Sequence, residues 1–146
     1  SYTRPWKFYY AQVEKIISLL ERQFKQGELE VDTYLRICEQ LGEEPDPEKL
    51  PITRDRYPHE VQQAFFIHDL LPDRWDGMSG SCFGKDMSAL GTLLDIWDIE
   101  DKRTVVYFIK HIEAYRVQKI NKEQEQKRKA KERSSKAGVK TPIRRR

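Results

Sequence analysis

The sequence predicts a mainly α-helical protein, and three observations lead to that prediction. Apolar residues recur three and four positions apart along several segments, which is the period of an amphipathic helix. No segment shows a convincing alternation of apolar and polar residues, the period of a half-buried strand. Glycine or proline follows most of the periodic segments, where these residues stop a helix. With 146 residues, the chain has the length of one ordinary domain.

The first two helices are predicted by apolar stripes that each end at a glycine. Pro5 suits a first helical turn, and Gly27 and Gly42 suit the position just after a helix. Because the connection between the stripes is short, we expect residues 1–42 to form an αα-hairpin of antiparallel helices. The first stripe is Tyr9, Val13, Ile16, Ile17, Leu20 and Phe24, and the second is Val31, Tyr34, Leu35, Cys38 and Leu41.

The middle of the chain alternates irregular and helical segments. Residues 43–58 contain four prolines and no usable period, so we expect an extended linker. A short helix is predicted from about Pro58 to Leu71, where Pro72 stops it. Residues 72–86 contain three glycines within eight positions and are predicted to be the most irregular loop of the chain. The predicted buried face of the short helix carries Val61, Phe65 and His68.

Two further helices complete a helical core over residues 59–121. Asp86 or Ser88 is expected to cap the first of them, and acidic residues 98–101 suit the N-terminus of the second. The apolar face of the first is Met87, Leu90, Leu94 and Trp97. The buried stripe of the second is Val105, Phe108, Ile109, Ile112, Tyr115 and Ile120.

Charge is distributed unevenly along the chain. The formal net charge of +3 conceals a basic tail, residues 122–146, which holds eleven basic and three acidic residues. The preceding part of the chain is therefore acidic. Because apolar positions end after Ile120, we expect the early tail to extend the last helix into solvent. From Ser134 onward we expect no regular structure in the isolated protein.

Composition excludes several classes of protein. Charged residues make up 35% of the chain and hydrophobic residues 38%, so the core must be modest. The apolar runs fall far below the ~20 residues of a membrane-spanning helix. The two cysteines, Cys38 and Cys82, cannot build a disulfide framework, and the first residues do not form a secretory signal. We therefore expect a soluble, cytoplasmic protein.

Sequence motifs for catalysis or metal binding are incomplete. Residues 80–85, GSCFGK, resemble a phosphate-binding loop, but three rather than four residues separate the glycines and Asp86 follows Lys85. Residues 77–81 lack the final glycine of a nucleophile elbow. Histidine and cysteine spacings do not match a zinc site. We expect no catalytic residues, no metal and no cofactor, with Cys38 in the core and Cys82 as a loop thiol.

The acidic cluster before the last helix has two interpretations. Asp95, Asp98, Glu100 and Asp101 could ligate a hard cation, since carboxylates suit such ions. Helix capping explains Asp98 or Asp101 without a metal, and the sequence has no calcium-binding loop pattern. We favour capping.

The aromatic residues suggest a surface for another protein. Trp75 lies in a loop rich in glycine and aspartate, where a large side chain suits a partner anchor better than a core. The first helix carries a second apolar set off its main face, which favours either an interface or a central place in the bundle. The candidate partner-binding residues are Trp6, Phe8, Trp75, Met78 and Phe83.

One part of the sequence resembles a known family. Residues 84–90, 93–99 and 108–115 follow the layout of loop, short helix, acidic turn and last helix with an aromatic near its end. This layout is similar to the C-terminal part of small tail-assembly proteins of long-tailed bacteriophages, with Asp98 where a glycine is usual. The resemblance implies a non-enzymatic helical protein that binds other phage structural proteins during assembly, and it carries over no active site.

The function expected from the sequence is therefore protein binding without catalysis, as a phage assembly factor or minor virion component. Its partners would be other structural or assembly proteins, in the host cytoplasm or the virion, with an oligomer possible. The alternative is a nucleic-acid-binding accessory protein that uses its basic tail to neutralise phosphates. Against the alternative, the tail has no aromatic residue for base stacking. The candidate residues for nucleic acid are Lys127, Arg128, Lys129, Lys131, Arg133, Arg144, Arg145 and Arg146.

Overall fold

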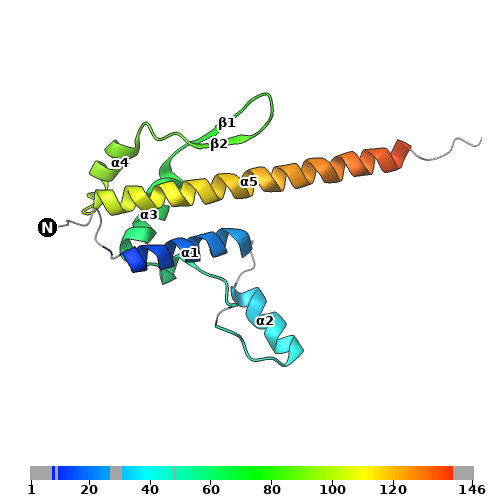
Figure 1. The fold of residues 1–146 in the computed structure, drawn as a ribbon, viewed down its shortest axis with the longest axis horizontal. Helices are drawn as coiled ribbons and strands as arrows, with labels where there is room; N and C mark the ends of the chain where they lie inside the picture. Colours follow the sequence, from blue (N-terminus) through cyan, green and yellow to red (C-terminus); the bar gives the residue numbers. More distant parts are fainter. Residues whose placement is uncertain (1–7, 9, 27–30, 48, 140–146) are drawn as a thin grey trace, which may run out of the picture.

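The protein is mainly helical, as the sequence predicts (Figure 1). The structure, a computed structural model, describes residues 8, 10–26, 31–47 and 49–139. In chain order the elements are α1 (Tyr10–Gln26), α2 (Val31–Leu41), the 3₁₀ turn η1 (Arg54–Arg56), α3 (His59–Leu70), β1 (Asp73–Trp75), β2 (Cys82–Lys85), α4 (Leu90–Ile96) and α5 (Lys102–Val139).

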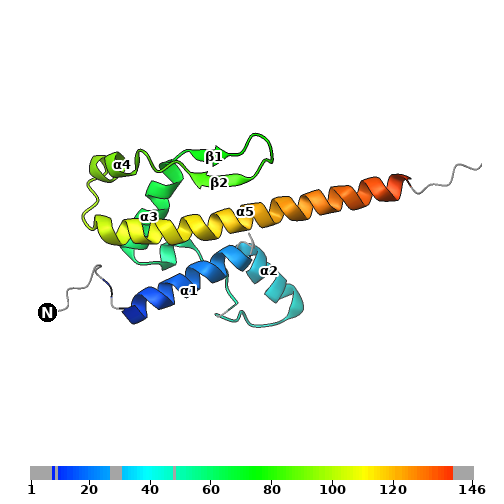
Figure 2. The same ribbon diagram turned by 45° about the horizontal axis from the view of Figure 1, so that its top comes forward.

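Helix α5 is the element on which α1, α3 and the β1–β2 hairpin pack. Its 38 residues correspond to a rod of about 57 Å at 1.5 Å per residue. Both ribbon views show α1 on one side of α5 and the β1–β2 hairpin on the other, with the C-terminal part of α5 projecting beyond both (Figures 1 and 2). Helices α1 and α3 pack against the N-terminal part of α5. The helical core predicted for residues 59–121 therefore also includes α1.

The core follows the predicted stripes of α1, α3 and α5. Val13, Ile16 and Leu20 of α1 meet Val61, Ala64, Phe65 and Ile67 of α3 and the buried stripe of α5. That stripe contributes Val105, Phe108, Ile109 and Ile112, each at most 1% exposed. Burying side chains of this size stabilises a fold by roughly 1.5–3 kcal/mol each.

The turn between α4 and α5 explains the acidic residues there. The N–H of Ile99 donates to the carbonyl of Leu94, and the N–H of Asp98 donates to that of Asp95. With Asp98 at φ +49°, this is a Schellman ending of α4, in which a glycine is favoured at the left-handed position. The Asp101 carboxylate accepts hydrogen bonds from the backbone N–H and hydroxyl of Thr104. Capping by Asp101 is thus confirmed.

The start and outer face of α4 differ from prediction. The carboxylate of Asp86 accepts from the N–H of Ser88 within a turn, and α4 begins only at Leu90, without a side-chain cap. Asp86 and Ser88 therefore do not cap this helix, because the turn uses both. Trp97, predicted on the buried face, is exposed and packs edge-to-face on Phe66 of α3 at 4.8 Å between ring centres.

The predicted antiparallel packing of the first two helices is not seen. Helix α2 turns away from α1 in both ribbon views, and α1 packs on α5 instead (Figures 1 and 2). In the stripe of α2 only Cys38 is fully buried; Val31 and Tyr34 are half-buried, and Leu35 and Leu41 stay exposed. The stripe of α1 finds a larger apolar surface on α5 and α3 than α2 could offer, which is the physical reason for the difference.

Residues 43–58 do more than link two parts of the chain. Ile52 and Tyr57 are buried in the core, and the Tyr57 hydroxyl donates to Oε1 of Gln23 at 2.8 Å. Burial raises the pKa of Tyr57 to about 12. Arg54 in η1 pairs with Asp69 and lies over the ring of Phe65 at 4.5 Å. This segment therefore belongs to the helical body.

Two segments contain more regular structure than the sequence predicts. Residues 72–86, expected to be the most irregular loop, form the antiparallel β1–β2 hairpin. The strands are too short to show a period of two, and a bulge at Phe83 breaks their register. Residues 134–139, expected to lack regular structure, continue α5. Lysine, arginine, glutamine, glutamate and alanine fill most of the positions before them, and these residues favour helix.

Candidate functional site

The β1–β2 hairpin is attached to α5 by hydrogen bonds between the backbone of β2 and side chains of α5. The N–H of Cys82 donates to Oδ1 of Asn121 at 2.9 Å, and Nδ2 of Asn121 donates back to the carbonyl of Cys82 at 3.2 Å. The N–H of Lys85 donates to Oε1 of Glu113 at 3.0 Å. Two side chains of α5, two turns apart, thus hold strand β2 along the helix.

Gly84 permits this close approach of strand and helix. Its φ is +95°, in the region that favours glycine, and a Cβ atom there would lie 2.7 Å from Oε1 of Glu113. Cys82, predicted to be a loop thiol, is instead buried against α5. The GSCFGK segment is therefore built for packing a strand on a helix, and its glycines do not form a phosphate loop.

A network of charged groups connects the hairpin to α5 and α3. Asp73 lies 2.8 Å from Nη1 of Arg116 and 3.4 Å from Nζ of Lys85. Partial burial opposes the charged form of Asp73, but hydrogen bonding and attraction to Arg116 and Lys85 prevail and lower its pKa. His68 of α3 is fully buried, with Nε2 3.6 Å from Oε1 of Glu113. Burial lowers the pKa of His68, and nearby Lys85 and Arg116 lower it further, while Glu113 works in the opposite direction.

The tip of the hairpin is also ordered by its own hydrogen bonds. The Asp76 carboxylate accepts from the N–H groups of Met78 and Ser79, which forms an Asx turn. The N–H of Gly80 donates to the Asp76 carbonyl at 2.9 Å, with Gly80 at φ +70°. The N–H of Asp76 in turn donates to the carbonyl of Ser81 at 2.9 Å. Binding at this tip would therefore order few further residues.

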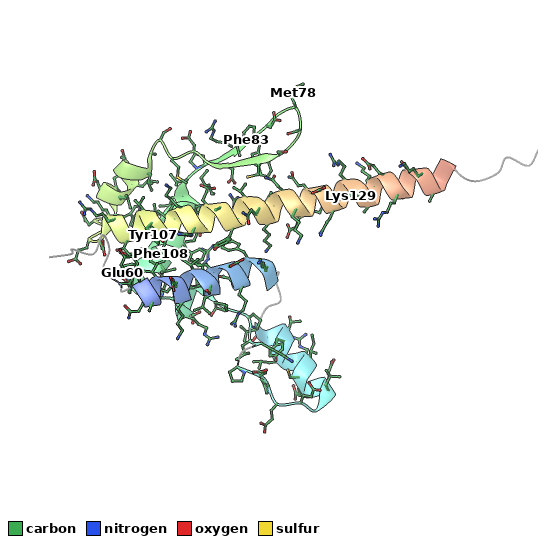
Figure 3. The ribbon with its side chains drawn as sticks, in the orientation of Figure 1. Glu60, Met78, Phe83, Tyr107, Phe108 and Lys129 are labelled. Atoms are coloured by element: carbon green, nitrogen blue, oxygen red, sulfur yellow. The ribbon has the colours of Figure 1, made fainter. Side chains whose placement is uncertain are left out.

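Three of the five predicted partner-binding residues lie on this hairpin and are exposed. The exposed fraction is 49% for Trp75, 96% for Met78 and 60% for Phe83. Figure 3 shows Met78 at the far end of the hairpin and Phe83 nearer its base, both away from the core. Large apolar side chains on an ordered projection are typical of an interface.

The other two predicted partner-binding residues do not join this surface. Phe8 is half-buried and packs edge-to-face on Phe108 at 6.2 Å between ring centres. Because Phe8 helps to close the core, we remove it from the partner-binding set. Trp6 lies outside the described residues.

A second exposed apolar surface joins α3 and α4, and the sequence analysis missed it. Phe66 and Leu70 of α3 are exposed one turn apart, and Phe66 packs on Trp97. Ile96 of α4 is exposed as well. One feature of the sequence indicates this surface. Phe66 and Leu70 are four residues apart and therefore share one face of the helix, which differs from the face of Val61, Phe65 and His68.

The basic part of α5 leaves the body as a single helix. Lys127, Arg128, Lys129, Lys131 and Arg133 are all exposed along it, and Figure 3 shows Lys129 on the projecting part of the rod. Lys129 pairs with Glu125 at 3.1 Å, one turn earlier. Arg144, Arg145 and Arg146 lie outside the described residues.

Within the described residues, no three histidine, cysteine or acidic side chains come together as a metal site. The same part of the chain has no helix with the length and apolar character needed to span a membrane. Comparison of the chain with protein-family models, with curated proteins and with solved structures gives no match. Function is therefore inferred from the surfaces described above.

Proposed function

We propose that the protein works by binding another protein through the β1–β2 hairpin. The observation that carries this proposal is Met78, which is almost completely exposed although the loop around it is ordered by Asp76. Exposing a large apolar side chain on an ordered loop does not stabilise the isolated fold. The arrangement is useful when a partner buries the side chain.

The energetics of the hairpin favour this role. Burying Trp75, Met78 and Phe83 in a partner would contribute roughly 1.5–3 kcal/mol for each side chain that becomes fully covered. Binding also costs conformational entropy, and a pre-ordered loop reduces that cost. Asn121 and Glu113 hold both ends of strand β2, so the position of the hairpin relative to α5 is already set.

The partner we propose is another structural or assembly protein, in phage morphogenesis or as part of a virion. This rests on the resemblance to small phage tail-assembly proteins. The left-handed backbone at Asp98 agrees with it, since those proteins have a glycine at this place in the turn. The proposed setting is the host cytoplasm or the virion.

The test is site-specific photo-crosslinking in the native source. A photoreactive residue replaces Met78 in one variant and Leu41 in a control, since Leu41 is also exposed but lies on α2. We expect one or a few proteins to crosslink at position 78 and not at position 41. Equal labelling at both positions, or none at position 78, would contradict the proposal.

A second variant separates binding from folding. Trp75→Ala should weaken capture of the crosslinked partner more than it lowers the melting temperature, because Trp75 is half exposed. A proportional loss of both would show that Trp75 serves the fold.

A further inference from the structure

The projecting part of α5 has a charge pattern that its net charge does not describe. With 3.6 residues per turn, Lys122, Lys129 and Arg133 fall on one side of the helix, which we call the first rail. Lys127 and Lys131 fall on another side, the second rail. The two rails lie roughly 160° apart around the helix axis.

The surface between the rails carries small side chains. Ala130, Ser134 and Ala137 occupy it, and we call this strip the floor; the longer Gln126 lies on the same strip nearer the body. On the opposite side of the helix, facing away from the floor, are Glu125, Glu132 and Arg128. Acidic groups are thus kept off the floor over most of its length. Glu123 is the exception, at the end nearest the body.

Two basic rails on either side of a small-residue floor suit a duplex groove. The major groove of B-form DNA is about 12 Å wide and admits an α-helix between two phosphate backbones. A helix seated there meets negative charge on both flanks and base edges in front. Small side chains in front allow close approach, while acidic groups behind face solvent.

We propose that the extension of α5 binds double-stranded DNA in the major groove, with Lys129 and Arg133 on one phosphate backbone and Lys127 and Lys131 on the other. The stretch from Lys127 to Ala137 is about 15 Å long, which spans about four base pairs. This inference is independent of the hairpin and goes beyond the protein-binding function.

The setting of the extension leaves it open for a duplex. From Lys122 to Gly138 its side chains are exposed, apart from half-buried Gln124. Both ribbon views show its C-terminal part clear of the rest of the described structure (Figures 1 and 2), whereas Lys122, Glu123 and Gln126 at its start line a pocket with residues at the end of α1.

The same geometry disfavours other nucleic acids. The major groove of A-form RNA is deep and narrow, so side chains on a helix do not reach into it. Binding of single strands relies on aromatic stacking, and residues 122–139 contain no aromatic side chain. B-form duplex DNA is therefore the expected ligand, ahead of duplex RNA and single strands.

The experiment measures binding of the full chain to a fluorescent mixed-sequence DNA duplex over a range of salt concentrations. Arg133→Gln and Arg128→Gln form a matched pair, because each removes one arginine but only Arg133 lies on a rail. We expect Arg133→Gln to weaken binding several-fold and to lower the salt slope by about one. Arg128→Gln should change affinity by less than about twofold, since its side chain faces away from the duplex.

A second pair tests the floor without changing charge. Ala130→Leu places bulk between the rails, and Ser135→Leu places it on the outer side. The first should weaken binding to DNA and the second should not. Circular dichroism of both variants checks that the helix is retained.

Several results would overturn the proposal. Equal effects of Arg133→Gln and Arg128→Gln would show binding by net charge alone. Equal affinity for duplex RNA or single-stranded nucleic acid would exclude binding in the DNA major groove. The absence of binding to any nucleic acid would exclude DNA as the ligand. Tighter binding to vesicles containing anionic lipid than to DNA would show that the basic extension binds a membrane surface. A Met78→Ser variant should bind DNA like the unmodified chain. The DNA-binding proposal can therefore fail without contradicting the hairpin proposal, which the crosslinking experiment tests.

Discussion

The two halves of α5 are parts of one continuous helix with opposite roles. Up to Asn121 the helix is covered by α1, α3 and the hairpin, and Phe108, Ile109 and Ile112 are almost completely buried. From Lys122 to Gly138 its side chains are exposed, apart from half-buried Gln124, and most of them are charged. Regular structure alone therefore does not reveal which part of a helix stabilises a fold. That follows from what the side chains touch.

The largest effect is expected from removing the central side chain of the packed half. Phe108→Ala should lower the free energy of unfolding by about 3–5 kcal/mol, because it leaves a cavity at a fully buried site. Urea unfolding followed by circular dichroism measures the change. The exposed Gln126→Ala serves as control and should stay within about 0.5 kcal/mol.

A smaller effect is expected at the boundary between the halves. Asn121→Ala removes both hydrogen bonds to Cys82 and should cost about 1–3 kcal/mol, since the backbone groups of a buried residue lose their partners. Amide exchange at Cys82 should speed up more than exchange at Val105. If both amides change equally, Asn121 stabilises the whole body rather than the hairpin.

Acid should destabilise the packed half through His68. Because burial holds the pKa of His68 below its ordinary 6.5, the unfolded chain binds a proton that the folded chain resists. Stability should therefore be constant above about pH 7 and fall as the pH drops through 6.5. Melting temperatures from pH 8 to pH 5 test this. His68→Gln should remove the larger part of the fall, and His111, whose pKa is also lowered by burial, should account for the rest. His59→Gln, at an exposed position, should leave it steep.

The smallest effect on folding is expected from deleting the extension. Removing residues 122–146 should change the melting temperature by only a few degrees, as expected for exposed residues. Helical circular dichroism should fall only by the share of helix removed. Global unfolding of the shortened chain would show that the extension is part of the fold.

The sequence predicts the packed half better than the rest of the molecule. The stripes of α1, α3 and α5 are long enough for their period to be read, and they form the core. The hairpin was missed because its strands have three and four residues and a bulge, so no alternation develops. The turn at Asp98 requires a left-handed backbone conformation, which an aspartate in the sequence does not predict.

Prediction of the candidate site was also uneven, for identifiable reasons. The exposure of Trp75, Met78 and Phe83 could be expected because these large apolar residues stand among glycines and polar residues. Phe8 was misplaced because its partner Phe108 is one hundred residues away, a contact that local pattern does not show. The exposure of Phe66 and Trp97 depends on how α3 and α4 meet, which is likewise a tertiary property.

Native-state hydrogen exchange of the full chain tests the division of α5 most directly. The packed half should exchange slowly, near the rate set by global unfolding, because its amides open only when the core does. Beyond about Gln126 exchange should be fast, since an unpacked helix is only marginally stable in water. Uniformly slow exchange from Val105 to Gly138 in the free monomer would contradict this account.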